Sequence, residues 1–106
     1  MTNELVKQKT EEPLKQHGLN GWKFEWLKKM NKFSKAGCCN YKTKTIKISP
    51  TFVELNDDDE VMNTILHEIA HALTPRHHHN KFWKRKAIEI GCTGATHYSI
   101  RVKRQK

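Results

Sequence analysis

The sequence predicts an α+β domain in which an N-terminal helix precedes a small three-stranded antiparallel sheet, a buried helix and one following helix. Two observations support this prediction. Apolar side chains alternate with polar ones around residues 22–26 and 45–49, which is the period of a strand with one buried face. From residue 61 to residue 73 the apolar side chains instead recur every three or four residues, which is the period of a helix.

The elements before the buried helix follow from local composition. Residues 3–17 are polar with scattered Leu5, Val6 and Leu14, which is typical of a short amphipathic helix. Pro13 predicts either a break in this helix or a position in its first turn, because proline lacks the backbone N–H that a helix interior needs. Strands are expected at residues 22–26, 36–41 and 45–49, and Pro50 should end the last of them.

The second half of the chain predicts helices. Asp57 and Glu60 have the spacing of a capping box, and the acidic run around them suits the positive end of a helix dipole. The many apolar positions between residues 61 and 73 indicate a helix buried on most of its circumference, and Pro75 should end it. A last helix is expected at about residues 80–90 before Gly91, and a short strand around residues 98–102.

Length and composition indicate one small domain. The 106 residues suffice for a single domain over residues 1–106, with a core at about residues 18–91 and a basic tail at residues 101–106. No apolar run resembles a signal peptide or a membrane span, so we expect a monomeric cytoplasmic protein. Cys38, Cys39 and Cys92 lack Cys-x-x-Cys spacing and indicate free thiols in a reducing compartment.

The charge of the chain is strongly positive and uneven. The formal net charge is +9, of which +7 falls in the first 53 residues. Residues 28–47 contain seven lysines and no acid, and the tail at residues 101–106 adds four more positive charges. Such a surface attracts a polyanion, so these two segments are candidates for binding DNA and for association with the nucleoid. An ordinary solvated face of the sheet explains the lysines equally well.

The run His67-Glu68-Ile69-Ala70-His71 lies on the predicted buried helix. Residues four apart lie about one turn apart on the same side of an α-helix, so both imidazoles leave the same face. Two histidines in that arrangement suit one tetrahedral metal, and zinc is the metal that histidine commonly holds in such sites. Glu68 lies on the flank of that face, where its carboxylate can take a proton from a water activated by the metal.

A catalytic zinc site needs a third protein ligand. The chain turns after Pro75 and offers His77, His78 and His79 before the last helix, so the residues alone leave the choice among these three open. Nothing in the sequence positions a hydrogen-bond donor for the oxyanion of a hydrolysis reaction, and we assign neither His97 nor Tyr98 to that role.

The motif helix, the turn and the segment His79-Asn80-Lys81-Phe82-Trp83 together resemble the SprT-like zinc metallopeptidase family. That family has a His-Glu-x-x-His helix, a turn of variable length, and a histidine followed four residues later by an aromatic residue. The resemblance implies a zincin-like fold, one zinc ion held by His67, His71 and His79, and Trp83 as a packing aromatic. His77 is the second choice for the third ligand. Many family members carry a four-cysteine zinc ribbon after these helices, which this chain lacks.

These residues support two hypotheses of different classes. The first is a zinc-dependent endopeptidase in which Glu68 is the general base, and the resemblance implies that its substrates are proteins associated with DNA. The second is a basic nucleic-acid-binding module whose zinc is structural, with Cys92 as a fourth ligand and without hydrolytic activity. The presence of Glu68 favours the first hypothesis, because a structural site has no need of a base at that position.

Overall fold

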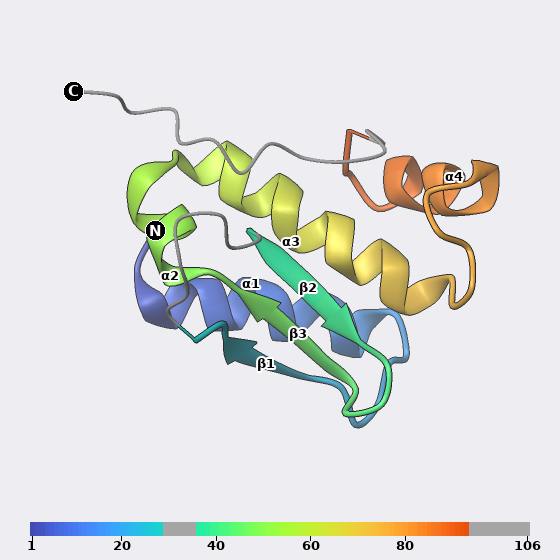
Figure 1. Ribbon diagram of the computed structural model, residues 1–106, viewed down its shortest axis with the longest axis horizontal. Coiled ribbons are helices and arrows are strands. Elements are labelled where there is room, and N and C mark those ends of the chain that lie inside the picture. The colour runs from blue at the N-terminus through green and yellow to red at the C-terminus, as the bar shows by residue number, and fades with distance from the viewer. Residues whose placement is uncertain (29–35, 94–106) are drawn as a thin grey trace.

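The computed structural model describes residues 1–28 and 36–93. Its elements are α1 (Asn3–Gln16), β1 (Lys23–Trp26), β2 (Gly37–Asn40), β3 (Thr45–Ile48), α2 (Pro50–Leu55), α3 (Asp58–Leu73) and α4 (Lys81–Glu89). The sheet forms one layer, α1 and α3 cover one face of it, and α4 packs on α3 (Figure 1). The predicted α+β class is confirmed. The expected strand at residues 98–102 lies outside the described residues.

The sheet is mixed rather than antiparallel, which corrects the prediction. Its strand order is β1-β3-β2, with β3 in the centre. β2 pairs with β3 in the expected antiparallel sense, but β1 runs parallel to β3 on the other side, with Phe24 opposite Ile46. Alternation of apolar residues specifies which face of a strand is buried and carries no information about its direction, so the pattern could not distinguish the two arrangements.

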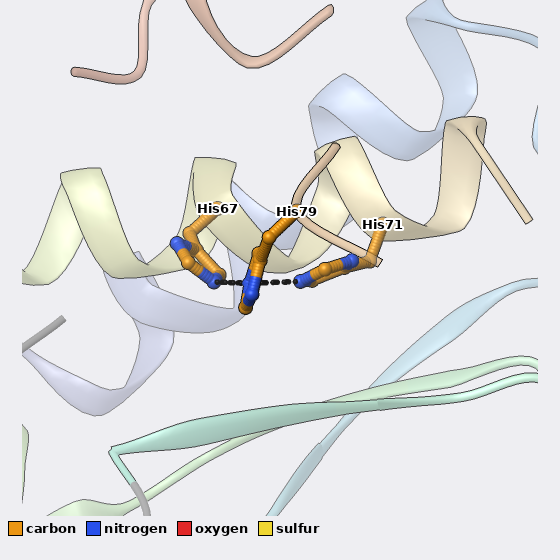
Figure 2. Close-up of side chains that lie close together, drawn as sticks. All are labelled: His67, His71 and His79. Atoms are coloured by element: carbon orange, nitrogen blue, oxygen red, sulfur yellow. Dashed lines mark hydrogen bonds between the residues drawn. The ribbon is translucent and has the colours of Figure 1, made fainter. Parts of the chain in front are cut away.

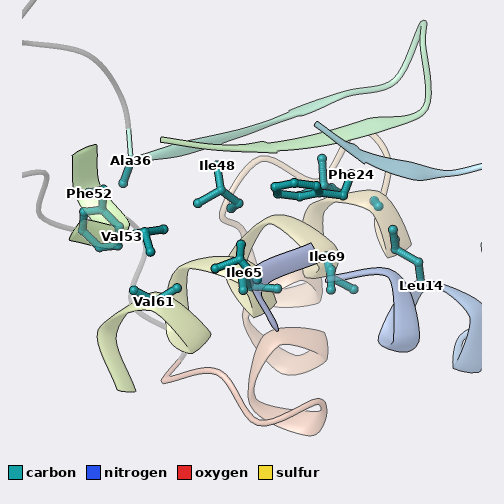
Figure 3. Packing of buried hydrophobic residues seen from close by; sticks show 12 residues of the cluster. Leu14, Phe24, Ala36, Ile48, Phe52, Val53, Val61, Ile65 and Ile69 are labelled. Atoms are coloured by element: carbon teal, nitrogen blue, oxygen red, sulfur yellow. The ribbon is translucent and has the colours of Figure 1, made fainter. Parts of the chain in front are cut away.

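The hydrophobic core lies between the sheet and the two helices that cover it. Phe24 and Ile48 point from the sheet toward Ile65 and Ile69 of α3, and Leu14 approaches from α1 (Figure 3). Ile48, Ile65 and Ile69 are fully buried. The core therefore fixes the face of α3 that is turned toward the sheet.

Pro13 acts differently from the prediction, and Pro50 has a second role besides the predicted one. Helix α1 continues through Pro13 to Gln16. Leu14 is buried directly after Pro13, so continuing the helix places an apolar side chain in the core, and this burial offsets part of the cost of proline in a helix. Pro50 ends the strand as expected but also begins α2, where Ser49 caps the helix by accepting a hydrogen bond from the Phe52 N–H at 3.2 Å.

The two helices of the second half agree with the sequence. Asp57 caps α3 by accepting a hydrogen bond from the Glu60 N–H at 3.0 Å, and α3 ends at Leu73 just before Pro75. Asn80 caps α4 in the same way, accepting from the N–H groups of Phe82 and Trp83. None of the helices in residues 1–28 and 36–93 has the length and apolarity of a transmembrane span.

Candidate metal centre

Helix α3 holds the first two histidines of the motif on the side that faces β2. Ile65 and Ile69 occupy the face toward the core, and the ~100° turn per residue places His67 and His71 well away from that face. Their rings lie 5.1 Å apart between centroids, and His67 is only 3% exposed. Packing of the apolar face thus determines where the imidazoles point.

The third histidine comes from the turn between α3 and α4. His79 Nε2 lies 2.9 Å from His71 Nε2 and 3.2 Å from His67 Nε2 (Figure 2). The backbone of His79 has φ 58°, a left-handed conformation that directs its side chain back toward α3. Within the described part of the chain, His67, His71 and His79 form the one group of three or more potential metal-ligating side chains.

The donor chemistry of this triad fits a cation better than a hydrogen-bond network. A neutral imidazole has one N–H and one ring lone pair, so the central Nε2 of His79 cannot form two well-directed hydrogen bonds to two other Nε2 atoms. A single ion accepts a lone pair from all three nitrogens at once. In a tetrahedral zinc site such nitrogens lie roughly 3.4 Å apart, close to the two short separations seen here.

Trp83 of α4 supports all three rings. Its ring centroid lies 4.8 Å from that of His67, 5.2 Å from that of His71 and 4.7 Å from that of His79. The side chain is fully buried, and its Nε1 has no hydrogen-bond partner among the described residues. The aromatic that the family resemblance singled out therefore fixes the orientation of the triad.

Burial and neighbouring charge keep His71 neutral. Desolvation lowers its pKa to about 4, and the neighbouring charges of His79 and His78 act in the same direction. A metal binds the neutral form of imidazole, so at neutral pH this ligand is ready to coordinate without losing a proton.

Glu68 lies between the core face of α3 and the histidines. It is 4% exposed and packs close to β2, where a Cβ built on Gly37 would lie 3.4 Å from Glu68 Cγ. Its negative charge contributes to the raised pKa of one residue in β2 and of one residue directly after it. Burial raises the pKa of the Cys39 thiol to about 12, and Glu68 adds to this shift. Burial likewise raises the pKa of Tyr41, with smaller contributions from Cys39 and Glu68.

The other candidate ligands lie apart from the triad. His77 Nδ1 lies 3.0 Å from Asn80 Nδ2 and its ring packs on Phe82, while His78 is exposed. The Cys92 thiol is buried and donates to the Asn63 carbonyl at 3.6 Å. No sequence pattern singled out Tyr41, yet its hydroxyl donates to the His71 carbonyl at 2.6 Å. No spacing rule links residues 41 and 71, so the sequence could not reveal this contact.

The fold is zincin-like, as the family resemblance implied. The structure is similar to the crystal structure of the metallopeptidase zymogen of Pyrococcus abyssi abylysin, with a TM-score of 0.64. The two chains share 19% sequence identity, and the match covers 80% of this chain and 78% of the other.

The chain belongs to the SprT-like family, whose model matches residues 2–104. The family predicted from the motif is thereby confirmed over nearly the whole chain. No curated protein matches the sequence.

Substitution of His79 should abolish tight zinc binding, because it removes one of three converging nitrogens. We expect His79→Ala to weaken zinc binding by more than the roughly 10- to 100-fold that supporting residues of metal sites contribute. His77→Ala and His78→Ala, from the same turn, are the matched controls and should keep the wild-type affinity. Competition with a chromophoric chelator measures all three, and equal affinities for His79→Ala and His78→Ala would contradict the assignment.

The metal-free protein should lose stability as the pH falls from about 6.5 toward 4. In this window unfolded His71, with its ordinary pKa of 6.5, binds more protons than folded His71, whose pKa is about 4. The free energy of unfolding should therefore fall with falling pH, and less steeply in His71→Gln. Urea unfolding at several pH values measures this difference, and parallel profiles for the two proteins would contradict it.

Proposed function

We propose that this protein is a zinc-dependent endopeptidase. The family and the zincin-like fold support a metallopeptidase in general. The observation that favours peptide hydrolysis by this chain is the position of Glu68, a buried carboxylate that immediately follows His67 on α3 and faces the same strand as the triad. A structural metal site needs no such group.

His67, His71 and His79 would hold the ion, which when bound supplies a Lewis acid for activating water and a carbonyl group. Glu68 takes a proton from the water whose oxygen forms the new bond to the scissile carbonyl carbon. As the C–N bond breaks, Glu68 returns that proton to the leaving amine. One carboxylate thus serves as base and then as acid, and the sum of the steps is addition of one water across the peptide bond.

The geometry suits an extended polypeptide substrate. β2 runs along α3 and, within residues 1–28 and 36–93, pairs with β3 on one side only. A peptide in extended conformation can add to an edge strand of a sheet. Such a peptide would lie between β2 and the triad, with its carbonyl groups close to Glu68.

The alternative, a structural zinc without hydrolysis, has less support. It requires a fourth ligand, and Cys92 is not part of the ligand group formed by the described residues. Cys92 instead packs with Ala70, Trp83 and Ala87 between α3 and α4. Cobalt substitution separates the two hypotheses, because a thiolate ligand gives an intense charge-transfer band that three histidines do not give.

We further propose that the protein associates with DNA. Of the two basic segments expected from the sequence, residues 29–35 and 101–106 lie outside the described residues. Lys42 and Lys44 are exposed in the turn after β2. Lys47 instead forms an ion pair with Glu25, with 4.0 Å between Nζ and Oε1. Lys28, Lys42 and Lys44 are therefore the exposed lysines of this segment among the described residues.

Helix α4 adds a basic face that was not among the predicted DNA-binding segments. Lys81, Lys84 and Arg85 are exposed at helical spacing, and the single acid of the helix, Glu89, pairs with Lys86 at 2.9 Å. The opposite end of the motif helix is acidic, with Asp57, Asp58, Asp59 and Glu60. A polyanion would therefore approach at the α4 end, and it is Trp83 of α4 that contacts the triad.

Glu68→Gln should abolish peptide hydrolysis while leaving zinc binding intact. The amide has nearly the shape of the carboxylate but cannot accept the proton of the attacking water, so a loss on the order of 100-fold or more in kcat is expected. A fluorogenic peptide assay on zinc-loaded protein measures the rate, with zinc content as the control. Wild-type rates in Glu68→Gln would rule out the proposed base.

Charge reversal on α4 should weaken DNA binding. Lys84→Glu with Arg85→Glu should lower the affinity for duplex DNA at least ~10-fold and reduce its dependence on salt, because each lost phosphate contact removes about one unit of salt slope. The matched control is Lys7→Glu with Lys15→Glu on α1, whose exposed face also carries Glu4, Glu11 and Glu12. Fluorescence anisotropy at several salt concentrations measures both, and equal effects of the two charge reversals would contradict a role for α4.

A further inference from the structure

Tyr41 lies where the turn after β2 meets the metal-binding end of α3. β2 begins at Gly37 beside Glu68, and Tyr41, directly after its last residue, contacts His71. The strand thus follows α3 along the whole motif, from the carboxylate to the second histidine. Tyr41 is consequently at the end of the same strand edge along which the proposed peptide substrate would lie.

The phenol ring is held in place yet remains accessible. It packs edge-on against Trp22, with ring centroids 6.0 Å apart, and its hydroxyl donates to the His71 carbonyl. Nevertheless Tyr41 is 40% exposed, unlike the buried Glu68. A ring that is oriented by its neighbours and open to solvent is suited to contact a bound molecule.

The hydrogen bond that the hydroxyl makes in the free protein is replaceable. The His71 carbonyl accepts from Tyr41 at 2.6 Å and also from the Thr74 backbone N–H at 3.2 Å. If the Tyr41 hydroxyl turns to another acceptor, the carbonyl keeps one donor and is not left unsatisfied. The O–H group is therefore available to a substrate at small cost.

We propose that the Tyr41 hydroxyl donates a hydrogen bond to the scissile carbonyl oxygen as negative charge develops on it. This inference rests on the proposed peptidase function, which requires stabilisation of that oxygen when water adds to the carbonyl carbon. The proton stays on Tyr41 throughout, because the group acts as a donor only, and Glu68 carries out the proton transfer. Tyr41 is then a catalytic residue that contacts the reacting atoms.

The test compares Tyr41→Phe with Thr74→Val. Both changes preserve shape and remove a hydroxyl that donates to a backbone carbonyl at the end of α3, since Thr74 Oγ1 donates to the Ala70 carbonyl at 2.8 Å. Under this proposal Tyr41 contacts the substrate and Thr74 does not. In Tyr41→Phe we expect kcat to fall about 100-fold, with KM and zinc content unchanged, as for removal of one oxyanion donor. Thr74→Val should keep the wild-type kcat.

A binding measurement independent of turnover completes the test. A phosphinic peptide, whose tetrahedral anionic group resembles the charged reaction centre, should bind Tyr41→Phe more weakly by about the same factor as the fall in kcat/KM. Equal kcat and equal phosphinic affinity in Tyr41→Phe and the wild type would refute the role. Loss of zinc or of the folded state in Tyr41→Phe would also refute it, because the hydroxyl would then be a structural support.

Failure of this inference is distinguishable from failure of the proposed function. If zinc-loaded wild type cleaves no peptide, the peptidase proposal fails, and the role of Tyr41 fails with it. If the wild type cleaves, Glu68→Gln does not, and Tyr41→Phe cleaves at the wild-type rate, only the role of Tyr41 is wrong.

Discussion

Packing of Ile65 and Ile69 against the sheet fixes the rotation of α3 about its axis, and the candidate site depends on that rotation. Each buried side chain contributes roughly 1.5–3 kcal/mol to folding, so a rotation that exposes them is strongly disfavoured. The same helix carries the motif, so the core that stabilises the domain also directs His67 and His71 to the side of α3 that faces β2. Helix α3 thus carries both core side chains and side chains of the candidate site.

The sequence predicted the part of the candidate site that lies on a single helix. The spacing of His67, Glu68 and His71 suffices, because helix geometry relates such residues without reference to the rest of the fold. The choice of His79 over His77 depends on a left-handed residue and on the cap that Asn80 supplies to α4, and only the family resemblance indicated it. Tyr41 depends on the position of β2 relative to α3, which is a tertiary relation that no local pattern encodes.

For the fold as well, local features were predictable from the sequence and tertiary ones were not. The elements and their buried faces follow from apolar periodicity, but the direction of β1 does not, because a parallel and an antiparallel β1 would both bury Phe24. Helix α2 carried a readable signal in Ser49 and Pro50, an N-cap followed by a proline at the first helical position. Continuation of α1 past Pro13 required knowledge that Leu14 enters the core.

The turn between α3 and α4 couples metal binding to the structure of the protein. Arg76 and His79 both adopt positive φ, which costs a residue with a side chain about 1–2 kcal/mol each. Without an ion, the three imidazoles cannot satisfy one another's hydrogen-bonding needs, although the His79 ring packs against Trp83. A bound ion would relieve the conflict among the nitrogens and offset the backbone cost of the turn. Metal binding should then stabilise this turn more than the sheet, which is held by its own core.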